Sequence, residues 1–181
     1  MPSAQLKVVL IGPENSGKST LMQYMKSNEV RTPGPRPLEN MATFNYKYNN
    51  KEIQVNIWDP VANNKFVTPV PDFYKTYFFG ADAYILLLRN DDIKYTHLLS
   101  RYLQETSTSC NSSFQFLGLN KVIPTEDDSQ IDLGVALEFS RLHHCKKLYA
   151  FNALNGIGVN EMLEDIVYKV CAAKQESFKE E

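Results

Sequence analysis

The stretch that decides the fold is LKVVLIGPENSGKSTLM, residues 6–22. It begins with a short apolar run rich in β-branched side chains that stops at Gly12, which is typical of a buried parallel strand. Residues 12–19, GPENSGKS, then fit the pattern G-x-x-x-x-G-K-[ST] in full. A helical pattern of apolar residues follows at once over residues 18–27. This order of strand, glycine-containing loop and helix predicts a phosphate-binding loop.

Each part of the loop has a physical reason. Gly12 and Gly17 let the backbone bend so that several N–H groups converge on phosphate oxygens. Lys18 is expected to reach the outer phosphates, and Ser19 is expected to place its hydroxyl on Mg²⁺. The positive end of the following helix points at the same anion. The candidate nucleotide-binding residues of this loop are Glu14, Asn15, Ser16, Gly17, Lys18, Ser19 and Thr20.

The remainder of the chain alternates between strand and helix patterns. Strands are predicted over residues 43–48, 52–58, 83–88, 113–119 and 147–151, and helices over residues 96–105, 134–142 and 158–174. The first two of these strands form a hairpin across Asn49, Asn50 and Lys51. We therefore expect an α/β fold with a mostly parallel, six-stranded sheet flanked by helices. Residues 1–181 form a single domain, structured to about residue 174 and frayed over the charged tail 175–181.

Composition limits the classes of function. The chain has 181 residues and a net charge of -2, so no global basic field points to nucleic acid as a partner. The three cysteines, Cys110, Cys145 and Cys171, are an odd count without metal-ligand spacing, which is typical of reduced cytosolic thiols. The longest strongly apolar run, residues 83–88, is too short to span a bilayer. We expect a cytoplasmic protein, either a monomer or part of a complex.

Five segments together suggest a family. LKVVLIGPENSGKSTLM, NIWDPVANNKF, YFFGADAYILLL, LGLNKV and AFNALNGIGVNEML occur in the order and approximate spacing found in Ras-like small GTPases. The chain resembles this superfamily over nearly its whole length, and most closely its Rab branch. The resemblance implies a P-loop NTPase fold, GTP or GDP with Mg²⁺ as ligands, and protein effectors or regulators as partners. It also implies a regulatory role in membrane or vesicle trafficking.

The chain departs from that family at the second phosphate motif, D-x-x-G followed by Gln. The corresponding residues here are Asp59, Pro60, Val61, Ala62 and Asn63. Asp59 keeps the carboxylate that, with Ser19, is expected to hold Mg²⁺. Ala62 keeps an N–H for the γ-phosphate but lacks the conformational freedom of glycine. Asn63, the candidate catalytic residue, is one methylene shorter than Gln, which predicts slow or absent hydrolysis because phosphoryl transfer depends on positioning.

Two further departures concern the first mobile loop and the charge of the phosphate loop. The family's Mg²⁺-coordinating Thr would fall near Arg36, in a proline-rich run, and Thr32 and Thr43 are the nearest alternatives. Glu14 occupies a position that the family usually keeps small. It is expected either to point into solvent or to point inward, where its charge would favour GDP over GTP.

The base-reading motif N-K-x-D is also altered. Asn120 and Lys121 are kept, but Ile123 replaces the Asp that would accept two hydrogen bonds from guanine. Asp127 and Asp128 are close in sequence but need a remodelled loop to take over. Residues 152–154 replace the usual S-A-K, and the Ala153 N–H is expected to meet the guanine oxygen. The candidate nucleotide-binding residues outside the phosphate loop are Ala62, Asn120, Lys121, Asn152, Ala153 and Leu154.

Partner binding leaves alternatives open. Trp58 and Tyr77 match two positions of the aromatic trio with which Rab-type proteins meet effectors, and Phe44 approximately the third, although all three could equally be core residues. Cys171 is followed by ten residues with no lipidation motif, so we expect no direct lipid anchor and recruitment to membranes by partners. A second interpretation is a pseudo-GTPase interaction module that does not cycle, for example in a transport complex. A P-loop kinase or ATPase is disfavoured because the later motifs have GTPase spacing.

Overall fold

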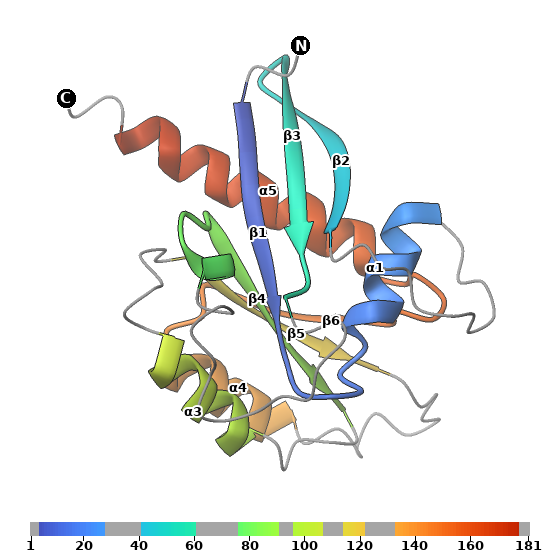
Figure 1. The fold of residues 1–181 in the computed structure, drawn as a ribbon, viewed down its shortest axis with the longest axis vertical. Helices are drawn as coiled ribbons and strands as arrows, with labels where there is room; N and C mark the ends of the chain where they lie inside the picture. Colours follow the sequence, from blue (N-terminus) through green and yellow to red (C-terminus); the bar gives the residue numbers. More distant parts are fainter. Residues whose placement is uncertain are drawn as a thin grey trace.

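A computed structural model describes residues 4–27, 41–60, 76–90, 96–106, 114–121 and 133–177. Six strands form one sheet in the order β2-β3-β1-β4-β5-β6, with helices around it (Figure 1). The strands are β1 (Ala4–Ile11), β2 (Met41–Tyr48), β3 (Lys51–Trp58), β4 (Ala83–Arg89), β5 (Gln115–Asn120) and β6 (Leu148–Phe151). The helices are α1 (Lys18–Ser27), α3 (Thr96–Thr106), α4 (Leu133–Leu142) and α5 (Val159–Ser177). Among the strand pairs of the described residues, only β2–β3 is antiparallel, which confirms the predicted mostly parallel α/β sheet.

The hairpin between β2 and β3 is tighter than expected. Asn49 and Asn50 form its turn with φ angles of 48° and 62°, and Lys51 already belongs to β3. Asparagine adopts this left-handed conformation more readily than most residues, and two such residues match the twist of a two-residue hairpin loop. The turn fixes the register of the pair, in which Met41 lies opposite Trp58.

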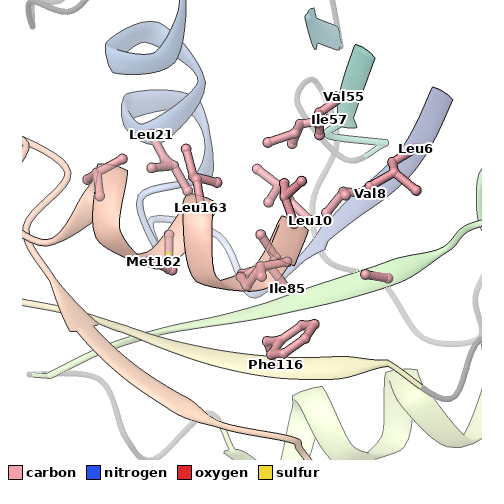
Figure 2. Packing of buried hydrophobic residues seen from close by; sticks show 14 of the residues in the cluster. Leu6, Val8, Leu10, Leu21, Val55, Ile57, Ile85, Phe116, Met162 and Leu163 are labelled. Atoms are coloured by element: carbon pink, nitrogen blue, oxygen red, sulfur yellow. The ribbon is translucent and has the colours of Figure 1, made fainter. Parts of the chain in front are cut away.

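The sheet separates two hydrophobic cores, and residues 8–11 of β1 are buried on both of its faces. Leu6, Val8 and Leu10 belong to one core with residues of α1 and α5, and Figure 2 shows Leu21, Met162 and Leu163 in the same cluster. Val9 and Ile11, with residues of β4 and β5, pack against α3 and α4 on the other face. Side chains of a strand alternate between the two faces of the sheet, so the part of β1 that is covered on both sides is apolar.

Helix α5 continues to Ser177, three residues beyond the end expected for the structured part of the chain. Tertiary contacts account for the extra length. Lys174 forms an ion pair with Asp82, and the Asn49 amide donates to Gln175 Oε1 over 3.4 Å. Residues 178–181 lie outside the described part of the chain. Of the helices that are described, none has the length and apolar character needed to cross a membrane.

The sheet brings the candidate site residues to one edge. Parallel strands end on the same side, and in α/β proteins ligands bind beyond those carboxyl ends. The phosphate loop (residues 12–19) follows β1, and Asp59 follows β3. Asn90, Asn120 and Asn152 end or directly follow β4, β5 and β6 respectively. Motifs that are far apart in the sequence therefore meet at one end of the domain.

Candidate functional site

The phosphate loop folds around the ammonium group of Lys18. Lys18 begins α1, and its Nζ donates to the carbonyl oxygens of Gly12 over 2.8 Å and Pro13 over 2.9 Å. It also lies 3.4 Å from the Ser16 hydroxyl. The side chain is only 7% exposed, so its charge is held inside the loop. A buried cation bound by loop carbonyls is well placed for an anion, because exchanging a carbonyl for a phosphate oxygen strengthens the contact.

Both glycines of the phosphate loop are required by close approach. A Cβ on Gly12 would lie 2.6 Å from the Leu87 carbonyl oxygen on β4. A Cβ on Gly17, whose φ is 97°, would lie 2.1 Å from Nδ2 of Asn120. Asn15 also has a positive φ, of 63°, and such turns direct successive N–H groups to one side. The loop therefore has the backbone shape of an anion-binding concavity.

Asn120 connects the phosphate loop to the base loop (residues 152–158). Its Nδ2 donates to the Ser16 carbonyl over 3.2 Å, and its Oδ1 accepts the Ala153 N–H over 3.1 Å. Its own backbone oxygen accepts the N–H of Asn90 over 3.1 Å. Asn120 is 3% exposed, so these bonds are shielded from water. Asn120 therefore supports the phosphate loop, and the Ala153 N–H, expected to meet guanine, donates to Asn120 in this structure.

The base loop is built by its own asparagines. Oδ1 of Asn152 accepts the N–H groups of Leu154 and Asn155 over 2.9 and 3.2 Å, and its own N–H donates to the Ile157 carbonyl. Short polar side chains that bond to following N–H groups stabilise turns. Asn152 thus shapes the loop, and Leu154 lies 50% exposed on its surface. The Lys121 N–H donates to the Phe151 carbonyl oxygen, which ties Lys121 to the end of β6.

The two candidate Mg²⁺ ligands differ in burial. Ser19 lies in the first turn of α1 and is exposed, whereas Asp59 is 1% exposed at the end of β3. Oδ2 of Asp59 is buried and accepts no hydrogen bond in the part of the chain that is described, although the residue has other contacts. Magnesium prefers few protein oxygens and keeps several waters. A hydroxyl and one carboxylate therefore fit that ion, and no group of three or more acidic, His or Cys residues forms a metal site among the described residues.

The structure bears on two of the alternatives left by the sequence. The Glu14 side chain is exposed, and the direction of its charge relative to the γ-phosphate stays a prediction. Thr43 lies within β2, and its hydroxyl donates to Asn56 Oδ1 over 2.9 Å, so the expectation that it could complete the Mg²⁺ site is wrong. The following predicted site residues and alternatives lie outside the described residues: Thr32, Arg36, Val61, Ala62, Asn63, Ile123, Asp127 and Asp128.

Comparison with known proteins agrees with the geometry of this phosphate-binding site. Residues 7–122 match the family model Roc, described as "Ras of Complex, Roc, domain of DAPkinase". This chain belongs to the Ras-like small GTPases. Membership implies that guanine nucleotide is its ligand.

Relatives of this GTPase domain come from more than one branch. ADP-ribosylation factor-like protein 2 of Dictyostelium discoideum is 24% identical over 90% of this chain and 86% of its own length. ADP-ribosylation factor-like protein 3 of Pongo abelii is 24% identical over 96% of this chain and 92% of its own. GTP-binding protein ypt4 of Schizosaccharomyces pombe is 22% identical over 90% of this chain and 70% of its own. These similar identities do not single out the Rab branch, so that assignment stays a prediction.

The three aromatic residues expected to meet effectors do not lie on one face of the sheet. The Trp58 and Tyr77 rings lie 6.0 Å apart, and both pack against the core on the α3–α4 face. Phe44 packs against the core on the α1–α5 face, so its inclusion is wrong. The reason is strand alternation, since Phe44 lies opposite Val55. Met41, the β2 residue opposite Trp58, shares the face of the Trp58–Tyr77 pair.

Sequence reasoning missed two contacts at this site. Nη1 of Arg89, at the end of β4, donates to the Asn15 carbonyl over 3.4 Å, which places a cation beside the phosphate loop. The signal for it was a charged residue ending the apolar run of residues 83–88. The second contact joins Tyr24 of α1 to Gly156 of the base loop. No local pattern could have indicated it, because the two residues approach only in the folded chain.

Proposed function

We propose that this chain is an atypical, Rab-like guanine-nucleotide-binding protein that regulates membrane or vesicle trafficking and hydrolyses GTP slowly or not at all. The observation that carries the proposal is the Asn120 side chain, which bonds both to the phosphate loop at Ser16 and to the base loop at Ala153. A site that must hold a phosphate and a base at once needs these two loops fixed relative to each other.

The residues take the following roles. Lys18 and the N–H groups of residues 14–20 bind the phosphates, and Asn120, Lys121 and the base loop bind the guanine side. Ser19 and Asp59 hold Mg²⁺, and the buried carboxylate oxygen of Asp59 fits a hard cation. When bound, Mg²⁺ supplies charge neutralisation of the phosphates. Arg89 adds a second cation beside the loop through its bond to Asn15.

Slow hydrolysis and the cellular role rest on different observations. Asn63 and Ala62 replace the family's Gln and Gly, so the chain is poorly equipped to orient an attacking water. The trafficking role rests on the resemblance of the sequence motifs to the Rab branch. Cytoplasmic residence with recruitment by partners belongs to the same proposal.

The proposal is tested by identifying the nucleotide that purifies with the protein. The protein is denatured, and the supernatant is separated by ion-exchange chromatography beside GDP, GTP, ADP and ATP standards. We expect GDP or GTP at close to one molecule per chain, and loss of both after incubation with EDTA. Adenine nucleotide would favour a P-loop kinase or ATPase. Absence of nucleotide, together with no uptake of Mg²⁺·GTP, would refute nucleotide binding.

A second candidate function is a pseudo-GTPase interaction module that does not cycle. It is favoured by Thr43, whose hydroxyl is hydrogen-bonded to Asn56 within the sheet. A hydroxyl held there is poorly placed to respond to the presence or absence of the γ-phosphate. A ligand shifts a conformational equilibrium only by its differential affinity for the two states. A module of this kind would bind its partner through Trp58, Tyr77 and Met41 equally well with either nucleotide. Pull-downs from native extract with GDP-loaded, GTP-loaded and Trp58→Ala protein separate the candidates, because a partner retained only by the GTP form identifies a switch.

A further inference from the structure

The helix that carries Lys18 also touches the base loop. A Cβ built on Gly156 would lie 2.2 Å from Cε2, Cζ and the hydroxyl oxygen of Tyr24. The Tyr24 ring therefore packs directly against the Gly156 backbone. Gly156 is buried and has a φ of 79°, so both its conformation and its surroundings exclude a side chain.

Gly156 lies at the centre of the base loop. Its N–H donates to the Asn152 carbonyl over 2.9 Å, and its carbonyl accepts the Val159 N–H over 3.1 Å. It therefore joins the residues that follow β6 to the first residue of α5. The Tyr24 ring therefore packs on a residue that is hydrogen-bonded to both ends of the loop.

The large apolar side chains of the loop do not hold it in place. Leu154 is 50% exposed and Ile157 is 69% exposed, so neither is buried against the core. The described contacts that reach the loop from outside include the Asn120 bond to Ala153 on the β5 side, the Met162 N–H bond to the Gly158 carbonyl from α5, and the Tyr24 ring on the α1 side. Ala153 is itself buried in the core on the α1–α5 face. Removing the Tyr24 ring takes away the support on the α1 side and should loosen the loop there, while the phosphate loop keeps its own bonds to Lys18.

We propose that Tyr24 is a positioning residue that sets the rate at which nucleotide leaves this protein. The inference rests on the proposed guanine-nucleotide binding. Tyr24 acts through Gly156, by keeping the base loop in the position from which it contacts the base. Without the ring the loop opens more often, and an opened base loop releases nucleotide.

The test measures dissociation of a fluorescent GDP analogue from the Mg²⁺-loaded protein, chased with excess GDP. Tyr24→Ala should release the analogue about tenfold faster, with a nearly unchanged association rate constant, because affinity changes within one site appear mainly in dissociation. Tyr24→Leu, which keeps bulk but not the planar ring, should also accelerate release. Tyr24→Phe keeps the ring and should release at close to the wild-type rate.

Met25→Ala is the matched control. Met25 is the neighbouring half-buried residue of α1 and packs against the same core, but it is not among the atoms nearest Gly156. It should lower thermal stability without accelerating release. If Met25→Ala accelerates release as much as Tyr24→Ala, or if Tyr24→Ala and Tyr24→Leu both release at the wild-type rate, the inference is overturned while nucleotide binding stands. A wild-type protein that takes up no guanine nucleotide overturns the proposed function, and the inference with it.

Discussion

Asn120 and Ser16 are separated by 104 residues of sequence, yet the Asn120 amide donates to the Ser16 carbonyl over 3.2 Å. The same side chain accepts the Ala153 N–H, so one buried asparagine joins the loops that follow β1, β5 and β6. Its Nδ2 also occupies the space that a side chain at position 17 would need. The glycine of the phosphate loop and the asparagine of the base-reading motif are therefore one structural unit.

Asn120→Ala should lower the free energy of unfolding by about 1–3 kcal/mol, because it leaves buried backbone groups at Ser16 and Ala153 without their partner. Urea unfolding of the nucleotide-free protein measures this effect. Gly17→Ala should cost less in the Asn120→Ala background than in the wild type, because the collision with Nδ2 is removed while the strain of a positive φ remains. Additive effects of the two changes would contradict the proposed unit.

Lys18→Ala should lower the affinity for guanine nucleotide sharply, because it removes a charge-assisted contact to phosphate. Lys26→Ala is the control, since Lys26 lies exposed in the last turn of the same helix. Equilibrium titration with a fluorescent GDP analogue measures both variants. Superimposable curves for the wild type and Lys18→Ala would refute the assigned role of Lys18.

Ile123→Asp should tighten the binding of GDP and GTP but not of ATP, because the restored carboxylate accepts hydrogen bonds that only guanine offers. The wild type should therefore select guanine less strongly, by about 2–3 kcal/mol, than a protein with the carboxylate. Competition titrations with GDP, GTP and ATP measure the preference. If the wild type already excludes ATP by several orders of magnitude, another group reads the base.

Intrinsic GTP hydrolysis should be slower than about 10⁻⁴ per second, because the water-positioning Gln of the family is absent. Asn63→Gln restores the missing methylene and should raise the rate, whereas Asn64→Gln should leave it unchanged. Single-turnover assays with radiolabelled GTP follow phosphate release directly. Rapid hydrolysis by the wild type, or no gain from Asn63→Gln, would contradict this explanation.

Acid should destabilise the contact that His143, directly after α4, makes with α3. Its Nε2 lies 2.7 Å from the Ser100 hydroxyl, and its ring packs 4.3 Å from that of Phe139. Burial lowers the pKa of His143, and the neighbouring His144 lowers it further. Below the ordinary histidine pKa of about 6.5, the unfolded chain takes up this proton before the folded protein does, so stability falls as the pH drops from there toward the folded pKa. Urea midpoints between pH 7.5 and 5 should decline less for His143→Gln than for the wild type, and parallel declines would exclude His143 as the cause.

The sequence alone determined the elements and their order. The pattern over residues 18–27 gave α1 with its observed bounds, and the alternating runs gave the β2–β3 hairpin, because helical spacing and period-two alternation are local properties. The phosphate loop was equally readable, since its glycines, Lys18 and Ser19 are neighbours in the chain. The family followed from several such local motifs occurring in one order.

Only the tertiary structure decided which side chains meet. Regular strand alternation places Phe44, three residues after Met41, on the face opposite Trp58 and leaves Met41 on the face of Trp58. Contacts with Asp82 and Asn49 extended α5 to Ser177. The Asn120–Ser16 bond and the packing of Tyr24 on Gly156 join residues that no local pattern relates. Such contacts depend on strand order, register and the path of each helix across the sheet, which are fixed only when the whole chain buries its apolar faces together.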